Sequence, residues 1–86
     1  MRITSGTLKN RKIKSREGKE TRPTLERIKE AIFSIIGDKI TDARFLDLYS
    51  GTGNMAIEAL SRGAGRAVMI EQDKEALRII IDNVND

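Results

Sequence analysis

The feature that most constrains the fold is a glycine turn between an apolar run and an expected helix. Residues 45–56 read FLDLYSGTGNMA, and a second apolar run, residues 67–70, ends at Glu71. Glu71 follows Gly51 by 20 positions. A strand, a glycine turn, a helix and a second strand closed by an acidic residue are typical of the first βαβ unit of a Rossmann-like domain. Such a unit binds a cofactor that carries adenosine.

The remaining segments are predicted to alternate between helices and strands. Residues 2–14 alternate basic with apolar or β-branched residues, which favours two short strands around a turn. A helix is expected to begin at Thr24 as its N-cap and to stop at Gly37. Strands are predicted at 44–49 and 66–71, and helices at 54–62 and after Asp73, which can act as a cap. The apolar residues at helical spacing are Leu25, Ile28, Ile32, Ile35 and Ile36 in the first helix, and Leu77, Ile80, Ile81 and Val84 in the last.

This order indicates an α/β protein. We expect a basic β-hairpin arm over residues 1–20 and the first part of a Rossmann-like domain over residues 21–86. Two parallel strands cannot bury both faces of a doubly wound sheet, which normally has about five strands or more. We therefore expect the chain to be a fragment of a longer protein. Association of chains to complete the sheet is the alternative.

Basic side chains are concentrated at the beginning of the chain. Residues 1–22 contain eight Lys and Arg and two Glu, although the net charge of the whole chain is only +3. A basic segment joined to a cofactor-binding unit favours an anionic macromolecule as partner, with nucleic acid as the first choice. A solvated, lysine-rich surface hairpin is the alternative.

Composition excludes several kinds of site. The chain has no Cys, so it holds neither a disulfide nor a thiolate metal site, which agrees with a reducing cytoplasm. It has no His, so a histidine base or ligand is excluded and no metal is expected. The first residues lack the apolar core of a signal peptide, and no run approaches about 18 apolar residues. We expect a cytoplasmic protein without a membrane segment.

Details of the glycine turn bear on the choice of cofactor. A nicotinamide-binding turn usually has three glycines and room for a pyrophosphate, and Ala56 at the third position is compatible with it. However, the turn from Ser50 to Gly53 is short, and Asp47 lies on the preceding strand. The carboxylate of Asp47 can pair with an ammonium group of a ligand, and the backbone N–H groups of the turn can bind a carboxylate of the ligand. An amino acid joined to a nucleoside carries both groups. S-adenosylmethionine is such a molecule.

Individual roles at the turn have alternatives. Glu71 is expected to accept hydrogen bonds from both ribose hydroxyls, or it is an exposed carboxylate that starts a turn. Asp47 contacts the ligand, or it binds loop amides at the end of its strand. Thr52 and Asn54 bind the ligand or cap the helix, and the sequence favours neither. Asp73 is expected to cap a helix rather than to bind a ligand.

Three stretches of the chain together resemble one protein family. They are MRITSG at residues 1–6, TRPTLERIKEAIF at 21–33 and FLDLYSGTGNMAIEALSRGA at 45–64. In this order and spacing they resemble the bacterial small-subunit ribosomal RNA guanine-N2 methyltransferases, over essentially all of the chain. The resemblance implies a Rossmann-like methyltransferase that uses S-adenosylmethionine, with a hairpin arm that engages ribosomal RNA or the small-subunit particle.

Candidate site residues follow from the pattern and the resemblance together. The cofactor-binding candidates are Asp47, Ser50, Gly51, Thr52, Gly53, Asn54 and Glu71. The candidates for contacts with RNA are Arg2, Lys9, Arg11, Lys12, Lys14 and Arg22. Contacts of this basic kind give affinity rather than sequence choice.

One departure from the family pattern concerns catalysis. The family carries an Asn/Asp-Pro-Pro-Tyr/Phe element whose oxygens hold the target amine and whose ring stacks on the base. This chain has one proline, Pro23, and no such element. We therefore expect no catalytic residue among these 86 residues, an inactive isolated chain, and a parent protein that methylates N2 of a guanine. The rival interpretations are an RNA-binding module without catalysis and a nucleotide-binding oxidoreductase fragment.

Overall fold

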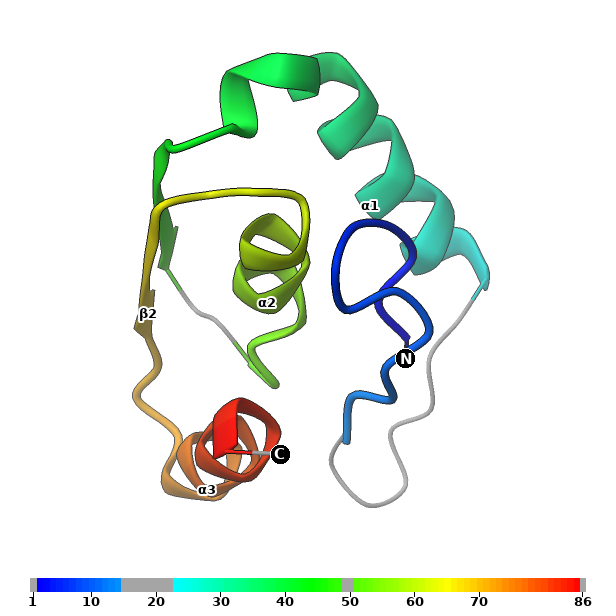
Figure 1. Ribbon diagram of the computed structural model, residues 1–86. Helices are drawn as coiled ribbons and strands as arrows, with labels where there is room; N and C mark the ends of the chain where they lie inside the picture. The colour runs from blue at the N-terminus through cyan, green and yellow to red at the C-terminus, as the bar shows by residue number, and fades with distance from the viewer. Residues whose placement is uncertain (1, 15–22, 49–50, 86) are drawn as a thin grey trace.

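The computed structural model describes residues 2–14, 23–48 and 51–85 (Figure 1). Helices and strands alternate in the order expected from the sequence. The elements are helix α1 (Pro23–Ile36), the short 3₁₀ turn η1 (Gly37–Ile40), strand β1 (Arg44–Leu48), helix α2 (Asn54–Ser61), strand β2 (Arg66–Ile70) and helix α3 (Lys74–Asn85).

The two strands form a parallel sheet that α2 covers on one face. Arg44 pairs with Arg66 at the beginning of the strands, and Leu48 pairs with Ile70 at their ends. The strands run side by side beside α2, which connects them (Figure 1). Because side chains alternate along a strand, the other face carries apolar residues that remain exposed. They are Leu46, Leu48, Val68 and Ile70.

Residues 2–14, called here the N-terminal loop, lie against α2 on the side away from the sheet (Figure 1). The two strands expected here are reduced to one antiparallel bridge between Arg2 and Lys12. The part of the expected hairpin arm from residue 15 onward lies outside the described residues. Ile3 and Ile13 are both buried against Ile57 of α2. The loop is therefore packed onto the protein by its apolar residues, while its basic residues alternate with them.

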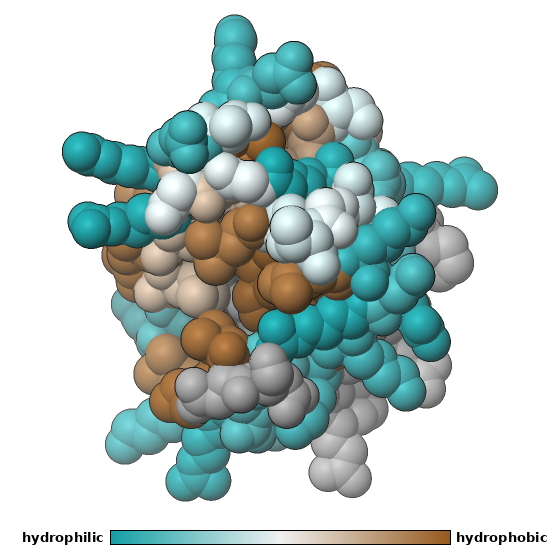
Figure 2. All heavy atoms as spheres, in the orientation of Figure 1, coloured by the Kyte–Doolittle hydropathy of each residue, from teal (hydrophilic) through white to brown (hydrophobic). Residues whose placement is uncertain are grey.

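α1 turns a different face to the protein from the one its apolar spacing predicts. Ile32 and Ile35 were expected to face inward, but Ile35 is 84% exposed. Phe33 and Lys29 are buried instead. Phe33 stacks on Phe45 of β1 with ring centroids 6.0 Å apart, and the ammonium of Lys29 pairs with a buried carboxylate of α2. These two contacts set the rotation of the helix, so part of its apolar stripe stays on the surface, as the exposure of Ile32 and Ile35 shows. On the face of the molecule seen in Figure 2, brown apolar side chains lie near the centre among teal charged ones.

The ends of the helices follow the sequence closely, with one correction. α1 begins at Pro23, one residue before the predicted N-cap Thr24, which agrees with the preference of proline for the first helical position. Asp73 caps α3 as predicted, because its Oδ1 accepts a hydrogen bond of 3.0 Å from the backbone N–H of Glu75. Of the four residues expected on the apolar face of α3, Ile80 is buried, whereas Leu77, Ile81 and Val84 are exposed.

Candidate functional site

The glycine turn and Glu71 meet at the ends of the two strands. The backbone N–H of Gly51 donates to Oε1 of Glu71 at 2.7 Å, and the N–H of Asp73 donates to Oε2 at 3.0 Å. The parallel register makes this possible, because Leu48 and Ile70 are partners and both strands end at the same edge. Two candidate residues that are 20 positions apart in sequence are thus in direct contact.

The same contacts favour the ionised form of Glu71. Hydrogen bonds from the backbone N–H groups of Asp73 and Gly51 hold the pKa of Glu71 below its ordinary value. A carboxylate has about four acceptor positions, so these donors fix its direction and leave capacity for a hydroxyl group of a ligand. The residue has the charge and orientation that a hydrogen-bond acceptor for a sugar requires.

The two glycines of the turn serve different purposes. Gly53 has φ of +82°, and a Cβ built on it would lie 3.2 Å from Sδ of Met69 and 3.6 Å from both Ile57 and Ile80. Gly53 is therefore needed for packing as well as for its left-handed backbone. A Cβ built on Gly51 would meet nothing within 4 Å. The turn is thus open at Gly51, on the side where a ligand can approach the backbone.

Two other candidate residues, Thr52 and Asn54, accept hydrogen bonds from other residues of the protein. The carbonyl of Thr52 accepts a hydrogen bond of 2.9 Å from Nδ2 of Asn83, and Oδ1 of Asn54 accepts one of 3.2 Å from Nζ of Lys29. Asn54 does not cap α2, since Gly53 occupies the N-cap position without a side-chain hydrogen bond. Asp47 is half-buried on the face of β1 that α2 covers. Ser50 lies outside the described residues.

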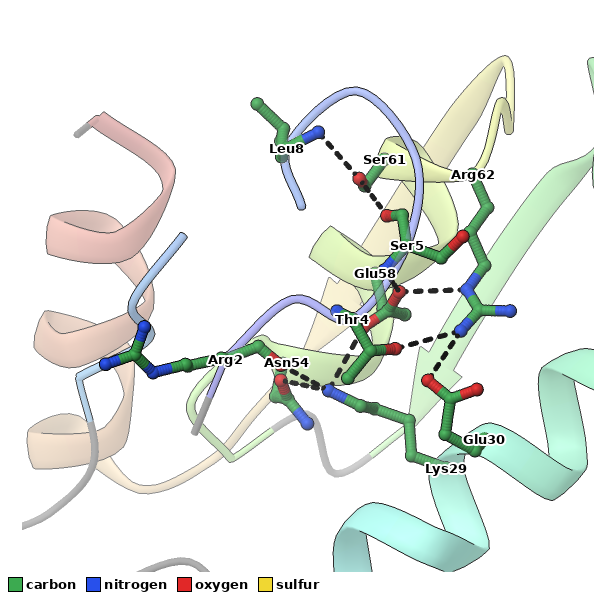
Figure 3. Close-up of polar contacts among 10 residues, drawn as sticks. All are labelled: Arg2, Thr4, Ser5, Leu8, Lys29, Glu30, Asn54, Glu58, Ser61 and Arg62. Atoms are coloured by element: carbon green, nitrogen blue, oxygen red, sulfur yellow. Dashed lines mark hydrogen bonds and ion pairs between the residues drawn. The ribbon is translucent and has the colours of Figure 1, made fainter. Parts of the chain in front are cut away.

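A buried ionic cluster, which the sequence analysis missed, connects α1, α2 and the N-terminal loop (Figure 3). The side chains of Glu58 and Lys29 are 0% and 1% exposed, and their charged groups are 3.1 Å apart. Arg62 donates from Nε to Glu58 at 2.8 Å, and Glu58 also accepts from the backbone N–H groups of Thr4 and Ser5 at 2.9 and 3.2 Å. Both oxygens of this carboxylate therefore face donors.

The sequence contains only a weak signal for this cluster. Glu58 lies between the apolar residues Ile57 and Ala59, which is unusual for a solvated side chain. Its spacing to Arg62 is that of a surface ion pair along one helix, whereas the pair with Lys29 joins two different helices. A local pattern cannot distinguish the surface pair from the buried one.

The candidate RNA-binding residues divide into two groups. Arg2, Lys9, Lys12 and Lys14 are exposed. Arg11 is partly buried, and its guanidinium donates to the carbonyl of Asn83 on α3, so it anchors the loop. Arg22 lies outside the described residues.

In residues 2–14, 23–48 and 51–85, no helix has the length and apolar content needed to cross a membrane. The same residues contain no group of three or more acidic, histidine or cysteine side chains suited to hold a metal ion.

Comparison with known proteins confirms the resemblance seen in the sequence. The model of the family described as conserved hypothetical protein 95 matches residues 1–86. The chain is 40% identical to the candidate rRNA methyltransferase YlbH of Bacillus subtilis over 84 residues, and 36% identical to ribosomal RNA small subunit methyltransferase D of Escherichia coli over 84 residues. These alignments cover 98% of the chain but 46% and 42% of the relatives, so the chain spans less than half of their length.

Solved structures show the same similarity in three dimensions. The candidate methyltransferase yhhF from Escherichia coli superimposes with a TM-score of 0.88 at 35% identity, and the match covers 99% of this chain and 46% of that one. A hypothetical protein from Thermus thermophilus superimposes with a TM-score of 0.83 at 31% identity, over 99% of this chain and 48% of that one. The arrangement of helices and strands described above is therefore shared with these proteins.

Proposed function

Because this chain belongs to the family of conserved hypothetical protein 95, we propose that it is the first part of an S-adenosylmethionine-dependent methyltransferase. The proposed substrate is the exocyclic N2 of a guanine in small-subunit ribosomal RNA, and the proposed domain is Rossmann-like with an N-terminal RNA-binding segment. The observation that carries the proposal is the contact between Glu71 and the N–H of Gly51 beside an open turn. The relatives named ribosomal RNA small subunit methyltransferase D support methyl transfer to small-subunit ribosomal RNA, whereas the choice of guanine N2 rests on the sequence resemblance.

The residues at the turn are compatible with this cofactor. Glu71 would accept hydrogen bonds from the ribose hydroxyls, and Asp47 would face the ammonium group. The N-terminus of α2 would face the carboxylate, since its first backbone N–H groups point toward the turn. The open side of Gly51 supports the close approach that this arrangement needs. When bound, S-adenosylmethionine supplies an activated methyl group on a positively charged sulfur.

The contribution of this chain to the reaction is positioning. Methyl transfer depends chiefly on holding the acceptor nitrogen and the methyl carbon close together and in line, and a turn that holds the cofactor serves that end. A guanine within a helix must be unpaired or flipped out before it reaches such a site. The residues that would hold the guanine are absent from this chain, so we propose that the 86 residues alone are inactive and that the full-length protein is active.

The cofactor proposal predicts the effect of one substitution. Replacing Glu71 by Gln should weaken S-adenosylmethionine binding to the full-length protein by roughly tenfold to a hundredfold. The amide would lose the charge and one acceptor, and its NH₂ group would face the N–H of Gly51 or of Asp73. Titration calorimetry measures the affinity. Asp82→Asn, which removes one exposed acidic charge from α3, is the matched control and should bind normally.

Three measurements separate the proposed function from its rivals. Tighter binding of NAD than of S-adenosylmethionine in the same calorimeter would replace the methyltransferase by an oxidoreductase. RNA binding without transfer of a labelled methyl group to unmodified small-subunit RNA would indicate a binding module only. An affinity that Glu71→Gln leaves unchanged would remove Glu71 from the cofactor site.

The basic face of the N-terminal loop predicts how RNA binding depends on salt. Replacing Lys9, Lys12 and Lys14 by Ala should reduce the slope of log affinity against log salt by about 2–3. Each exposed lysine that contacts a phosphate releases roughly one counterion, and Arg11 is left intact because it anchors the loop. Filter binding over a salt series measures the slope. The control is the triple variant Lys39→Ala, Lys74→Ala and Arg78→Ala, which removes the same charge outside the loop; equal slopes for both variants would refute a role for the loop.

A further inference from the structure

Asn83 of α3 joins the glycine turn to one end of the N-terminal loop. Its side chain is buried, with the residue only 1% exposed. Nδ2 donates to the carbonyl of Thr52 at 2.9 Å and to the carbonyl of Lys14 at 3.1 Å, while Oδ1 accepts from the N–H of Lys14 at 2.8 Å. One amide group thus pairs with both backbone groups of Lys14 and with the turn.

Lys29 of α1 makes the corresponding connection at the other end of the loop. Its Nζ donates to the carbonyl of Arg2 at 2.8 Å and to Oδ1 of Asn54 at 3.2 Å, and it pairs with Glu58. Figure 3 shows the Lys29 side chain pointing toward both Arg2 and Asn54. Asn54 is the first residue of α2, directly after the glycine turn. The two ends of the loop are themselves paired through the bridge between Arg2 and Lys12.

The loop is therefore attached to the turn at both ends by buried polar side chains. A buried donor or acceptor that loses its partner is strongly unfavourable, because no water replaces the missing hydrogen bond. Movement of Thr52 or Asn54 away from its partner would break the hydrogen bond to Asn83 or to Lys29. Displacement of the loop has the same consequence at Lys14 and Arg2.

We propose that the occupancy of the turn and the binding of RNA by the loop are energetically coupled, with Asn83 and Lys29 as positioning residues. This proposal rests on the proposed function of the two sites. Cofactor binding orders the turn, the two side chains transmit that order to the loop, and the loop then presents its basic residues in one arrangement. By reciprocity, RNA tightens cofactor binding by the same factor. Neither side chain contacts a substrate in this scheme.

The test is the ratio of two cofactor affinities. S-adenosylmethionine is titrated into the full-length protein alone and into the protein saturated with an unmodified small-subunit RNA fragment. We expect RNA to tighten binding by about fivefold or more in the unaltered protein. In Asn83→Asp the acceptor for the Lys14 N–H remains, but the donors to Thr52 and Lys14 are lost, so the ratio should fall toward one. The exposed neighbour Asp82, changed to Asn, should leave the ratio unaltered.

The ratio distinguishes coupling from a purely structural role. A structural defect lowers both affinities by a common factor and preserves the ratio, so an Asn83→Asp protein with the unaltered ratio would overturn the proposal. Normal binding of cofactor and RNA with a ratio near one in the unaltered protein would overturn the coupling and leave the proposed function standing. Failure of the unaltered protein to bind S-adenosylmethionine would overturn both.

A measurement without any variant provides a second test. Hydrogen exchange of the unaltered protein reports on the loop through three amides, those of Ile3, Asn10 and Lys14, which donate to Arg11, Ile3 and Asn83 respectively. Saturation with S-adenosylmethionine should slow their exchange, although none of them belongs to the turn. Unchanged exchange at all three amides contradicts the coupling, whether or not Asn83→Asp folds.

Discussion

Replacing Glu58 by Gln should lower the free energy of unfolding by about 3–5 kcal/mol. The substitution keeps the shape of the side chain but removes the charge that compensates Lys29, which is buried beside it at 3.1 Å. The new NH₂ group would also face donors, since both carboxylate oxygens accept hydrogen bonds from Thr4, Ser5 or Arg62. The cost is that of leaving a buried charge and several donors without a partner. Urea denaturation of the full-length protein measures it.

Glu30 supplies a matched control, because it pairs with the same arginine at the surface. Its carboxylate lies 3.1 Å from Nη2 of Arg62, and its side chain is 46% exposed. Replacing Glu30 by Gln should therefore cost less than about 1 kcal/mol. Similar losses for Glu30→Gln and Glu58→Gln would mean that burial does not set the strength of this cluster.

At acid pH, the original protein and Glu58→Gln should have the same free energy of unfolding. Burial alone would raise the pKa of Glu58, but hydrogen bonds from Arg62, the Thr4 backbone and Lys29 outweigh it, so the pKa lies below its ordinary value of 4.5. A carboxylate with a lowered pKa stabilises the folded state fully above its unfolded pKa, and this contribution is lost as pH falls through the folded pKa. The two unfolding free energies should thus converge below about pH 4.5. A difference that stays constant at pH values well below this would contradict the account.

Replacing Gly6 by Ala should detach the N-terminal loop from α2 and cost about 3 kcal/mol or more. A Cβ at Gly6 would lie 1.8 Å from the carbonyl oxygen of Ser61, and Gly6 also has φ of +86°. The loop would have to move away and lose the hydrogen bonds of Thr7 and Leu8 to Ser61. Movement would also expose Ile3, which is buried against Ile57.

Gly37→Ala is the control that measures the cost of the left-handed backbone conformation without a steric clash. It has φ of +54°, yet a Cβ there would meet nothing within 4 Å. Gly37→Ala should therefore cost only about 1–2 kcal/mol. Limited trypsin digestion provides a local measurement, because a detached loop exposes its basic residues to cleavage. Gly6→Ala with the stability and digestion pattern of Gly37→Ala would show that the close contact with Ser61 is unimportant.

The glycine turn was predictable because its signals are local. A short apolar run, two glycines within three residues and a second apolar run ending at Glu71 all lie between Phe45 and Glu71. Each of them restricts the backbone or the strand register directly. The structure joins Gly51 and Glu71 by a hydrogen bond that the pattern did not predict, and Asp73 caps α3 as its position predicted. The ligand of the turn remains a proposal.

The orientation of α1 was not predictable from its spacing. Its spacing places Ile28, Ile32 and Ile35 on one side, yet all three are exposed. The rotation of the helix is set instead by Phe33 and Lys29. Their partners, Phe45 and Glu58, come from other elements. A local sequence pattern predicts that a lysine within a helix is exposed to solvent. It became an inward-facing residue only because a buried carboxylate was present opposite it.

Short-range patterns predict the order of helices and strands and the glycine turn, since these depend on propensities and spacing over a few residues. The packing of the basic segment on α2, and its connection to the turn through Glu58, Lys29 and Asn83, depends on long-range contacts. The contacts of Lys29 with Asn54 and of Asn83 with Lys14 join residues that are 25 and 69 positions apart. Whether a polar side chain is buried depends on which distant donor or acceptor the fold places within hydrogen-bonding distance, and short-range patterns carry no information about that.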